Sequence, residues 1–362
     1  MENSMKYIEK SNTMNEFRYL NLEDQNSCYD YYKTYAKKLI ERLKPENNLY
    51  NSKSEKMFNF DYKWDDCVNA GSIELKELDM IRINEGTILK LYNLFYKLNT
   101  HANIIELAYE PKSCTEIRSR IIYTNHKESD KKIEAEMAFS DDVIRNNIAE
   151  YMAMFAIKWV IAHEIGHAFN GHTNYYQEIR KKIQNTNNDK DKEELFLELQ
   201  TMEMDADTFA INRVVDEVMN LYKNNDKILL FLKNQKDLLR LVILSIHGVF
   251  FLFRDNDNYE DAKVEHPSTF VRECFTLDSM KESLSKNYCF NISHDYLMQD
   301  IAEIEKTMNI LFPKNNELYL SYIKNKTCEI KECVERIQNN FKNSTKYKIK
   351  NEARLPVEGI DY

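Results

Sequence analysis

A short run near the middle of the chain has two histidines four residues apart and a glutamate between them, His163-Glu164-Ile165-Gly166-His167. Residues four apart share one face of a helix, so both imidazoles can reach a single ion. Zinc accepts imidazole nitrogen at about 2.0–2.1 Å in a tetrahedral site. Glu164 lies about 100° further round the helix, which places its carboxylate beside a water on the metal. The pattern predicts a zinc site with Glu164 as general base.

A surface helix carrying two unrelated histidines is the alternative interpretation. Histidine is scarce, with 8 in 362 residues. The run is also preceded by apolar residues, among them Phe155, Trp159 and Val160, which are typical of a buried helix. Both observations favour the metal site, and Gly166 would allow another element to approach the helix closely.

A catalytic zinc usually has three protein ligands and one open position. The metzincin extension would need Gly at position 170 and His at position 173, but the chain has Asn170 and Thr173, and Gly171 and His172 are each one place off. A carboxylate on a later helix remains, which predicts Glu203 as the third ligand.

Glu203 belongs to the acidic run Glu203-Met204-Asp205-Ala206-Asp207. Asp207 shares a helical face with Glu203, whereas Asp205 points about 200° away. Asp207 could accept the ring N–H of a liganding histidine, His163 in the first instance, and so fix its tautomer. The alternative is a solvated acidic face, and the preceding histidine motif favours the ligand.

A third group of residues, His266-Pro267-Ser268-Thr269-Phe270-Val271-Arg272, follows a polar loop at the start of a predicted helix. Either His266 or Arg272 could stabilise the oxyanion that forms when water attacks a carbonyl. A His-Pro pair at a helix start is also ordinary, so the residues alone leave both interpretations open.

The three motifs together, HEIGHAFNGH, EMDADTFA and HPSTFVR, resemble those of gluzincin peptidases related to the CAAX prenyl peptidases and the HtpX-type heat-shock peptidases. The resemblance covers roughly residues 140 to 275. It implies that Glu203 is the third zinc ligand and that His266 and Arg272 border the active site. Peptidases of that group are usually anchored by transmembrane helices, and this sequence predicts none.

The motif helix is also similar to that of the Lit-type phage-exclusion peptidases, which are intracellular zinc enzymes that disable their bacterial host by cutting one of its proteins. This resemblance is confined to the motif helix. It implies a cytoplasmic enzyme with a protein or peptide substrate and a role in phage defence.

Composition and charge agree with a cytoplasmic globular protein. Hydrophobic residues make up 43%, and the net charge is −9, from 50 basic and 59 acidic residues that are mixed along the chain. No basic stripe predicts a nucleic-acid partner. Seven scattered cysteines without a Cys-x-x-Cys pair favour a reducing compartment. The N-terminus predicts no secretory signal, and the apolar run Leu241 to Phe253 is too short to span a membrane.

The sequence predicts an α+β fold that is mostly helical. A small antiparallel sheet precedes the motif helix, which begins after the capping cluster 140–142 and ends at Asn170-Gly171. The expected strands are 80–83, 104–109, 118–123 and 132–139, and the expected helices are 29–43 (closed by Pro45), 86–98, 143–169, 193–222, 227–253, 269–285, 296–311 and 318–341. We expect an N-terminal helical extension over 1–75, a zinc metallopeptidase domain over 76–285 and a C-terminal helical region over 286–362.

The run 131–139 alternates apolar and polar residues, as a half-buried strand does. As an edge strand beside the cleft it could bind an extended peptide, and as a core strand it could not. Two other functions remain open at this point. One is a non-catalytic binding or scaffold protein stabilised by zinc, against which the intact Glu164 argues. The other is a membrane-surface peptidase docked through 241–253. The oligomeric state, the substrate and the activation trigger are not predicted.

Overall fold

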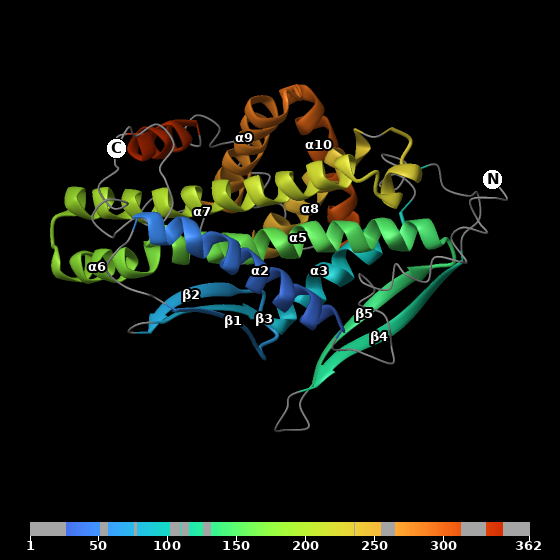
Figure 1. Ribbon diagram of the computed structural model, residues 1–362, viewed down its shortest axis with the longest axis horizontal. Helices are drawn as coiled ribbons and strands as arrows, with labels where there is room; N and C mark the ends of the chain where they lie inside the picture. Colours follow the sequence, from blue (N-terminus) through green and yellow to red (C-terminus); the bar gives the residue numbers. More distant parts are fainter. Residues whose placement is uncertain are drawn as a thin grey trace.

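The computed structural model describes residues 27–50, 57–75, 78–101, 109, 116–125, 132–234, 236–254, 265–312 and 331–342. Helices dominate the described residues, and two small sheets accompany them, which confirms the mostly helical α+β fold. Figure 1 shows two long helices at the centre, a three-stranded sheet on one side of them and a group of shorter helices on the other.

The central pair consists of α5 (Val143–Phe169) and α7 (Asp189–Lys223), which pack along each other. Helix α6 (His172–Asn185) joins them at one end, so α7 runs back along α5 (Figure 1). Nearly every α5 side chain is buried, as its apolar sequence predicts. The chain turns back at Gly171, whose φ of 75° is a conformation that glycine adopts without strain. The predicted bounds of this helix are confirmed.

The three-stranded sheet has the order β1-β3-β2, with β1 (Met57–Lys63) parallel and β2 (Ala70–Leu75) antiparallel to β3 (Leu78–Asn84). Its buried side chains, Phe60, Ile81 and Ile83, join the main core. Only β3 was predicted from the sequence. The sheet matters for function because β2 lies against α5 and α6.

A separate two-stranded ribbon pairs β4 (Ile117–Asn125) with β5 (Lys132–Ser140) in antiparallel register. Alternate side chains of β5, namely Ile133, Ala135 and Met137, are buried, and the strand packs on α3 (Glu85–Leu98) and α5. Both predicted strands of this ribbon are confirmed. Apart from Tyr109, the predicted strand 104–109 lies outside the described residues.

The first described helix, α2 (Ser27–Tyr50), packs on α5 through side chains that recur every three to four residues. Lys158 of α5 is buried beneath it, with its Nζ 2.6 Å from Glu217 Oε1 and 4.9 Å from the ring centroid of Tyr35. The predicted end at Pro45 is wrong, because the helix continues to Tyr50. Proline removes one helical hydrogen bond, and here that loss does not end the helix.

Three shorter helices complete the main body, α8 (Asp237–Phe253), α9 (Thr269–Tyr288) and α10 (His294–Leu311). A 3-10 turn, η2 (Lys227–Leu230), precedes α8, so the single helix predicted over 227–253 is interrupted. Residues 331–342 form a further helical segment near the start of α7, where Asn340 Nδ2 donates to Thr201 Oγ1 at 2.8 Å. The remainder of the helix predicted over 318–341 lies outside the described residues.

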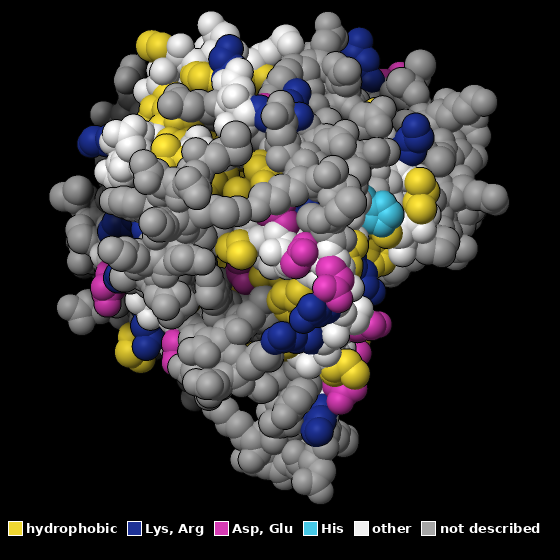
Figure 2. Space-filling view, turned by 90° about the vertical axis from the view of Figure 1, so that its right-hand side faces the viewer, with side chains coloured by type: hydrophobic (Ala, Val, Ile, Leu, Met, Phe, Trp, Pro, Cys, Tyr) yellow, Lys and Arg dark blue, Asp and Glu magenta, His cyan; other side chains and the backbone are white. Residues whose placement is uncertain are grey.

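The apolar run of α8 forms part of the protein core, since residues 241–251 are all almost fully buried. No helix within the described ranges is long and apolar enough to cross a membrane. On the face drawn in Figure 2, acidic and basic side chains of the described residues are interspersed. The five cysteines that lie in described segments are free.

A buried ionic network ties α8, α9 and α10 together. The two ring nitrogens of His247 lie 2.7 Å from Glu273 Oε1 and 2.8 Å from Glu305 Oε2. Glu305 also accepts two hydrogen bonds from Arg254, at 2.7 and 2.9 Å. Burial lowers the pKa of His247, but Glu273 and Glu305 outweigh that effect and raise the pKa to about 9. The network therefore links three helices inside the protein core.

Candidate metal and active site

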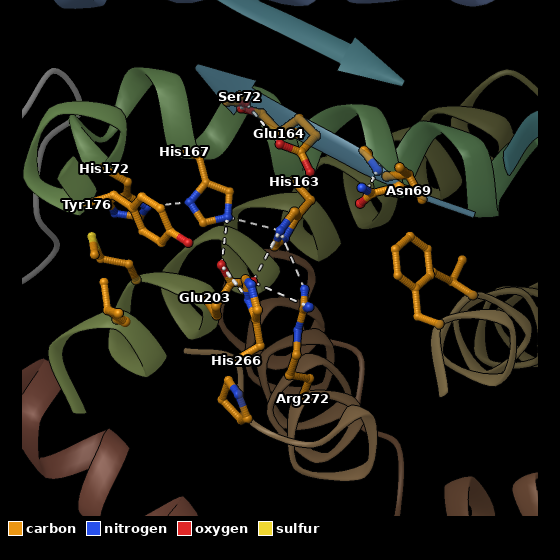
Figure 3. Close-up of a pocket in the computed structure, with 18 of the residues that line it drawn as sticks. Asn69, Ser72, His163, Glu164, His167, His172, Tyr176, Glu203, His266 and Arg272 are labelled. Carbon is orange, nitrogen blue, oxygen red and sulfur yellow. Dashed lines mark hydrogen bonds and ion pairs between the residues drawn. The ribbon is translucent and has the colours of Figure 1, made fainter. Parts of the chain in front are cut away.

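The motif histidines lie in the last two turns of α5. The helix is fixed at its start by Asp142, whose side chain accepts a hydrogen bond from the Ile144 N–H at 3.0 Å. At the other end, His163 and His167 project toward Glu203 of α7, whereas Glu164 points to Ser72 of β2 (Figure 3). The motif therefore lies in the last turns of a helix, as the sequence predicts.

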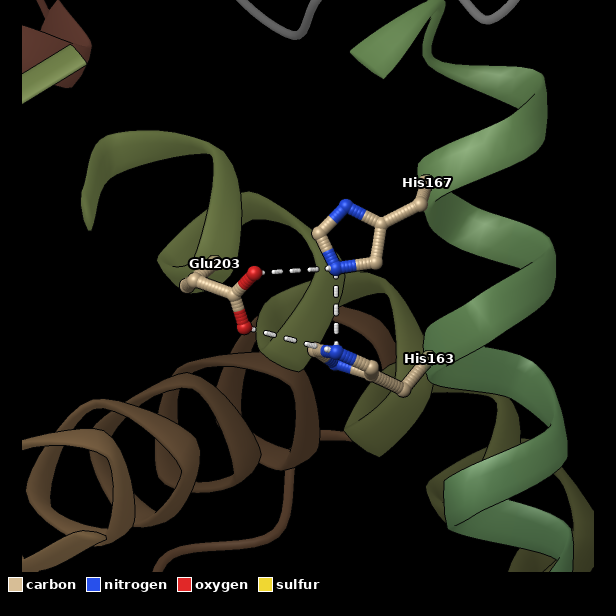
Figure 4. A group of neighbouring side chains, drawn as sticks. All are labelled: His163, His167 and Glu203. Atoms are coloured by element: carbon tan, nitrogen blue, oxygen red, sulfur yellow. Dashed lines mark hydrogen bonds and ion pairs between the residues drawn. The ribbon is translucent and has the colours of Figure 1, made fainter. Parts of the chain in front are cut away.

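His163, His167 and Glu203 form a group whose donor atoms converge (Figure 4). The two Nε2 atoms are 3.0 Å apart, His167 Nε2 is 3.3 Å from Glu203 Oε1, and His163 Nε2 is 3.6 Å from Glu203 Oε2. Ligands at about 2.0–2.1 Å from a tetrahedral zinc lie about 3.3 Å from one another. The observed separations bracket that value, so the spacing of this donor set is compatible with a zinc ion.

Small residues on both helices allow this convergence. Gly166 faces Phe209 of α7, and a Cβ atom at position 166 would lie 3.0 Å from Phe209 Cδ1. Ala206 and Ala210 are fully buried on the facing side of α7. This contact agrees with the prediction that Gly166 allows another helix, here α7, to approach α5 closely.

Asp207 lies behind His163, as the shared helical face predicted. Its Oδ1 is 2.9 Å from His163 Nδ1, and the carboxylate also accepts two hydrogen bonds from Arg272, at 2.7 and 2.9 Å. The side chain is completely buried. Burial raises the pKa of Asp207, but Arg272 and His163 outweigh that effect, so the pKa lies below its usual range. Asp207 is thus an anion that can hold a proton on His163 Nδ1 and leave Nε2 free for a metal.

Both residues predicted from the third motif reach Glu203 from the other side. His266 Nδ1 lies 3.2 Å from Glu203 Oε1, and Arg272 Nη1 lies 3.3 Å from Glu203 Oε2. They differ in exposure, since the His266 side chain is 56% exposed and that of Arg272 is 13% exposed. His266 can therefore face a substrate, whereas Arg272 is occupied with two buried carboxylates.

The surrounding cations favour an ionised Glu203. Burial raises the pKa of Glu203, but His266, His167 and Arg272 together bring it well below its usual range. For His167, burial lowers the pKa, but the charge and hydrogen bond of Glu203 together with the charge of Glu164 outweigh burial and raise the pKa. Glu203 raises the pKa of His266 in the same way. An ionised Glu203 is the form that could bind a divalent cation.

Glu164 lies beside the three converging residues and contacts β2. Ser72 Oγ is 2.6 Å from the main-chain oxygen of Glu164 and 3.0 Å from its Oε2. The hydroxyl has one proton, so it can donate to one of these oxygens or share the proton between them. Sequence reasoning missed Ser72, because a single serine in an unpredicted strand gives no signal.

The same residues line a cavity of about 590 Å³. One wall is formed by residues 67–73, which include most of β2. Another is apolar and formed by Trp159 of α5 with Val249, Phe250 and Phe253 of α8. Glu164, His163, His167 and Glu203 face this space, with Ser72 and Glu164 on one side of the histidines and His266 and Arg272 on the other (Figure 3).

Strand β5, which the sequence offered as a possible edge strand beside the cleft, contributes no residue to the cavity lining. It packs on α3 and α5 and pairs with β4, so the structure favours its interpretation as a core strand. The strand beside the cavity is β2. Within the described residues it pairs with β3 alone, which leaves its other edge along the cavity wall.

Helix α6 supplies residues that the sequence analysis did not assign to the site. Tyr176 lines the cavity, and its hydroxyl donates to Glu265 Oε2. Arg180 donates to both oxygens of Glu265, at 2.8 and 2.9 Å. Glu265 directly precedes His266, so these contacts attach the His266 segment to α6.

His172, which the spacing excluded as a ligand, lies behind His167. Its Nδ1 is 3.0 Å from His167 Nδ1, on the opposite side of the ring from the converging Nε2 atoms. The exclusion of the metzincin arrangement agrees with this geometry.

Residues 111–285, nearly half of the chain, match the family model Peptidase U49. The matched segment contains the whole of α5, α6, α7 and α8 and most of α9, and with them every candidate site residue except Ser72. Comparison with curated proteins and with solved structures gave no match. The match supports a peptidase, and the resemblance to the CAAX prenyl and HtpX-type peptidases is not confirmed.

Proposed function

We propose that this protein is a zinc-dependent endopeptidase that cleaves a protein target through a metal-activated water. The observation on which the proposal chiefly rests is the convergence of His163, His167 and Glu203 at tetrahedral spacing beside Glu164. The peptidase match over residues 111–285 supports the same reaction class.

In this proposal His163, His167 and Glu203 would hold the zinc, which when bound would supply a water of lowered pKa and polarise the scissile carbonyl. Glu164 takes the proton of the attacking water and passes it to the leaving amine. Ser72 holds the Glu164 carboxylate at the edge of β2.

His266 and Arg272 then have different tasks, although either could have stabilised the oxyanion on sequence grounds. His266 is exposed to the cavity and can donate to the oxyanion. Arg272 keeps Asp207 and Glu203 in place through its hydrogen bonds and ion pair. Its positive charge lies close to the reaction centre and favours an anionic transition state without direct contact.

The substrate would bind as an extended segment along β2. The edge of that strand that no described strand pairs with lies beside the cavity and offers main-chain donors and acceptors, and the cavity accommodates side chains. An apolar side chain of the substrate fits the wall of Trp159, Val249 and Phe250.

A purely structural zinc is the competing function. A structural site is usually closed by four protein ligands, whereas among the described residues the donor set has three members, and it faces a cavity. Glu164 lies where a base is needed and outside the ligand set, which also favours catalysis. From the Lit-type resemblance we further propose a cytoplasmic target protein and a role in phage defence.

The test compares zinc-loaded wild type with Glu164→Gln on a peptide library derived from a bacterial proteome, with new termini identified by mass spectrometry. We expect new termini with wild type, and a loss of about 10²–10⁴-fold in the variant, which should still bind zinc. Equal cleavage by both proteins would refute the assigned base. Cleavage by neither, in the library and in the same proteome left folded, would favour the structural zinc.

A further inference from the structure

The two histidines of the metal site are supported in different ways. His163 Nδ1 faces a carboxylate directly, that of Asp207 at 2.9 Å. His167 Nδ1 instead faces a second imidazole, His172 Nδ1 at 3.0 Å. His172 Nε2 in turn lies 3.1 Å from Asp205 Oδ2. Two buried side chains in series, His172 and Asp205, therefore support His167, whereas the single side chain of Asp207 contacts Nδ1 of His163.

Only one assignment of protons along this series suits a metal on His167. A metal at Nε2 uses the lone pair of that nitrogen, so Nδ1 of His167 must carry the proton and donate it. His172 Nδ1 then accepts, which places the proton of His172 on Nε2. That proton points to Asp205 Oδ2, a carboxylate acceptor. Every group in the series has a partner of the right kind, and reversing either imidazole would set two donors or two acceptors against each other.

The local fold is arranged to produce these contacts. The left-handed conformation of Gly171 turns the chain so that His172, the first residue of α6, comes back beside His167. Asn170 caps the end of α5, and its Nδ2 donates to Asp205 Oδ2 at 2.6 Å. His172 is 1% exposed and Asp205 7% exposed, so water competes little for these bonds.

Asp205 lies on the side of α7 that points away from Glu203, as its position in the helix predicts. Helix α6 packs against α7 and covers that side, so Asp205 is buried rather than solvated. Glu203 therefore lies at one nitrogen of the His167 ring, with its Oε1 3.3 Å from Nε2. Asp205, two residues further along α7, reaches the other nitrogen through His172.

We propose that His172 and Asp205 are positioning residues that fix the tautomer and orientation of His167, so that its Nε2 lone pair points at the metal. This inference rests on the zinc site of the proposed function. It extends that site by a pair of residues that lie behind His167 and do not bind the metal.

The same contacts could have a purely structural role, which is to hold helices α5, α6 and α7 together. The two roles differ in what they predict for metal affinity at equal stability. A histidine with the same burial offers a matched control: His247 is 1% exposed, and both of its ring nitrogens have buried partners, Glu273 and Glu305, in the network of α8, α9 and α10. Loss of His247 should destabilise the protein without changing the orientation of His167.

The experiment measures zinc affinity by competition with a chromogenic chelator, together with thermal unfolding of the metal-free proteins, for wild type, His172→Leu, His172→Gln and His247→Leu. Glutamine has an acceptor and a donor that can face His167 and Asp205 as the imidazole does. We expect His172→Leu to weaken zinc binding by about 10–100-fold and His172→Gln to restore most of it. His247→Leu should lower the unfolding temperature and leave zinc affinity unchanged.

The series also predicts that Asp205→Ala weakens zinc binding and that the double variant His172→Leu/Asp205→Ala binds no more weakly than His172→Leu. When one residue acts through another, the effects of their two substitutions on zinc affinity do not add. Wild-type affinity in folded His172→Leu would overturn the proposal while leaving the zinc site intact. Absence of zinc binding in wild type would overturn both.

A measurement on the wild type guards against a variant that does not fold. Long-range ¹H–¹⁵N correlation spectra of the zinc-loaded protein report which nitrogen of each histidine carries the proton. We expect the proton on Nδ1 of His167 and on Nε2 of His172. A proton on Nδ1 of His172 would overturn the proposal.

Discussion

Replacing Asp207 with asparagine tests the support behind His163. The wild-type carboxylate is completely buried, accepts two hydrogen bonds from Arg272 and lies 2.9 Å from His163 Nδ1. Asparagine keeps the volume and one acceptor oxygen but removes the charge. The Arg272 side chain is only 13% exposed. In the variant, its remaining carboxylate partner in the site is Glu203, whose Oε2 lies 3.3 Å from Arg272 Nη1.

Two effects of Asp207→Asn follow from this geometry. Removing one partner of a buried ion pair costs about 3–5 kcal/mol of unfolding free energy. Loss of a carboxylate behind a metal-binding histidine weakens metal affinity about 10–100-fold, which equals about 1.4–2.8 kcal/mol. The first effect should be visible in urea unfolding of the metal-free protein, and the second in a zinc competition titration.

Asp216→Asn on the same helix is the control for Asp207→Asn. Asp216 is 40% exposed, accepts from the Tyr288 hydroxyl at 2.8 Å and pairs with Arg213 at 3.4 Å. Its replacement should change stability by no more than about 1 kcal/mol and leave zinc affinity unchanged. If Asp207→Asn behaved like Asp216→Asn in both measurements, the role given to Asp207 would be refuted.

Three further predictions concern other parts of the molecule. Ser72→Ala should lower kcat about 10–100-fold without loss of bound zinc, because a hydrogen bond to the charged carboxylate of the base is removed, and an unchanged kcat would contradict the contact. The pKa of His247 is raised to about 9, so its contribution to stability is full below its unfolded pKa of about 6.5 and is lost as the pH rises through 9. Urea midpoints at pH 6 and pH 9.5 should therefore converge for wild type and His247→Gln at the higher pH, and a constant difference would exclude this titration. Gly86→Ala should destabilise the protein by about 1–3 kcal/mol, since the new Cβ would overlap the Asp66 backbone, whereas Gly71→Ala has open space and should differ little from wild type.

The main features of the site could be predicted from the sequence because they depend on local periodicity. An apolar run with an N-cap at Asp142 and a stop at Asn170-Gly171 defines α5, and residue spacing alone places His163 and His167 on one face. The pairing with Glu203 needed one assumption, that a later helix packs on the first. Small residues at the contact make that packing possible.

The missed strands fall into two kinds. In β1 the residues Phe58, Phe60 and Tyr62 alternate with polar neighbours, so a period-2 signal was present just after the polar run 51–56. In β2 the sequence Ala-Gly-Ser-Ile-Glu-Leu has small and polar residues, and it becomes a strand through pairing with β3. Tertiary contacts decide such a segment, and Ser72 could not be assigned to the site without them.

The role of Asp205 shows a similar limit. A helical projection gives the direction of its side chain correctly but does not tell what covers that side of α7. The covering helix α6 owes its position to the left-handed turn at Gly171, which a projection of α7 does not include. His172 was considered only as a ligand, and its contact with the rear of His167 depends on the same turn.

The most direct test of the central claim is the zinc content of purified protein, measured by elemental analysis on wild type, Glu203→Ala and His172→Ala after metal reconstitution. We expect one zinc per chain in wild type and a sharp reduction in Glu203→Ala. His172→Ala should still reach one zinc at saturating metal, because His172 supports His167 without binding the ion. Absence of zinc from wild type, or zinc that is retained in Glu203→Ala and lost only in His172→Ala, would contradict the assignment of the metal site.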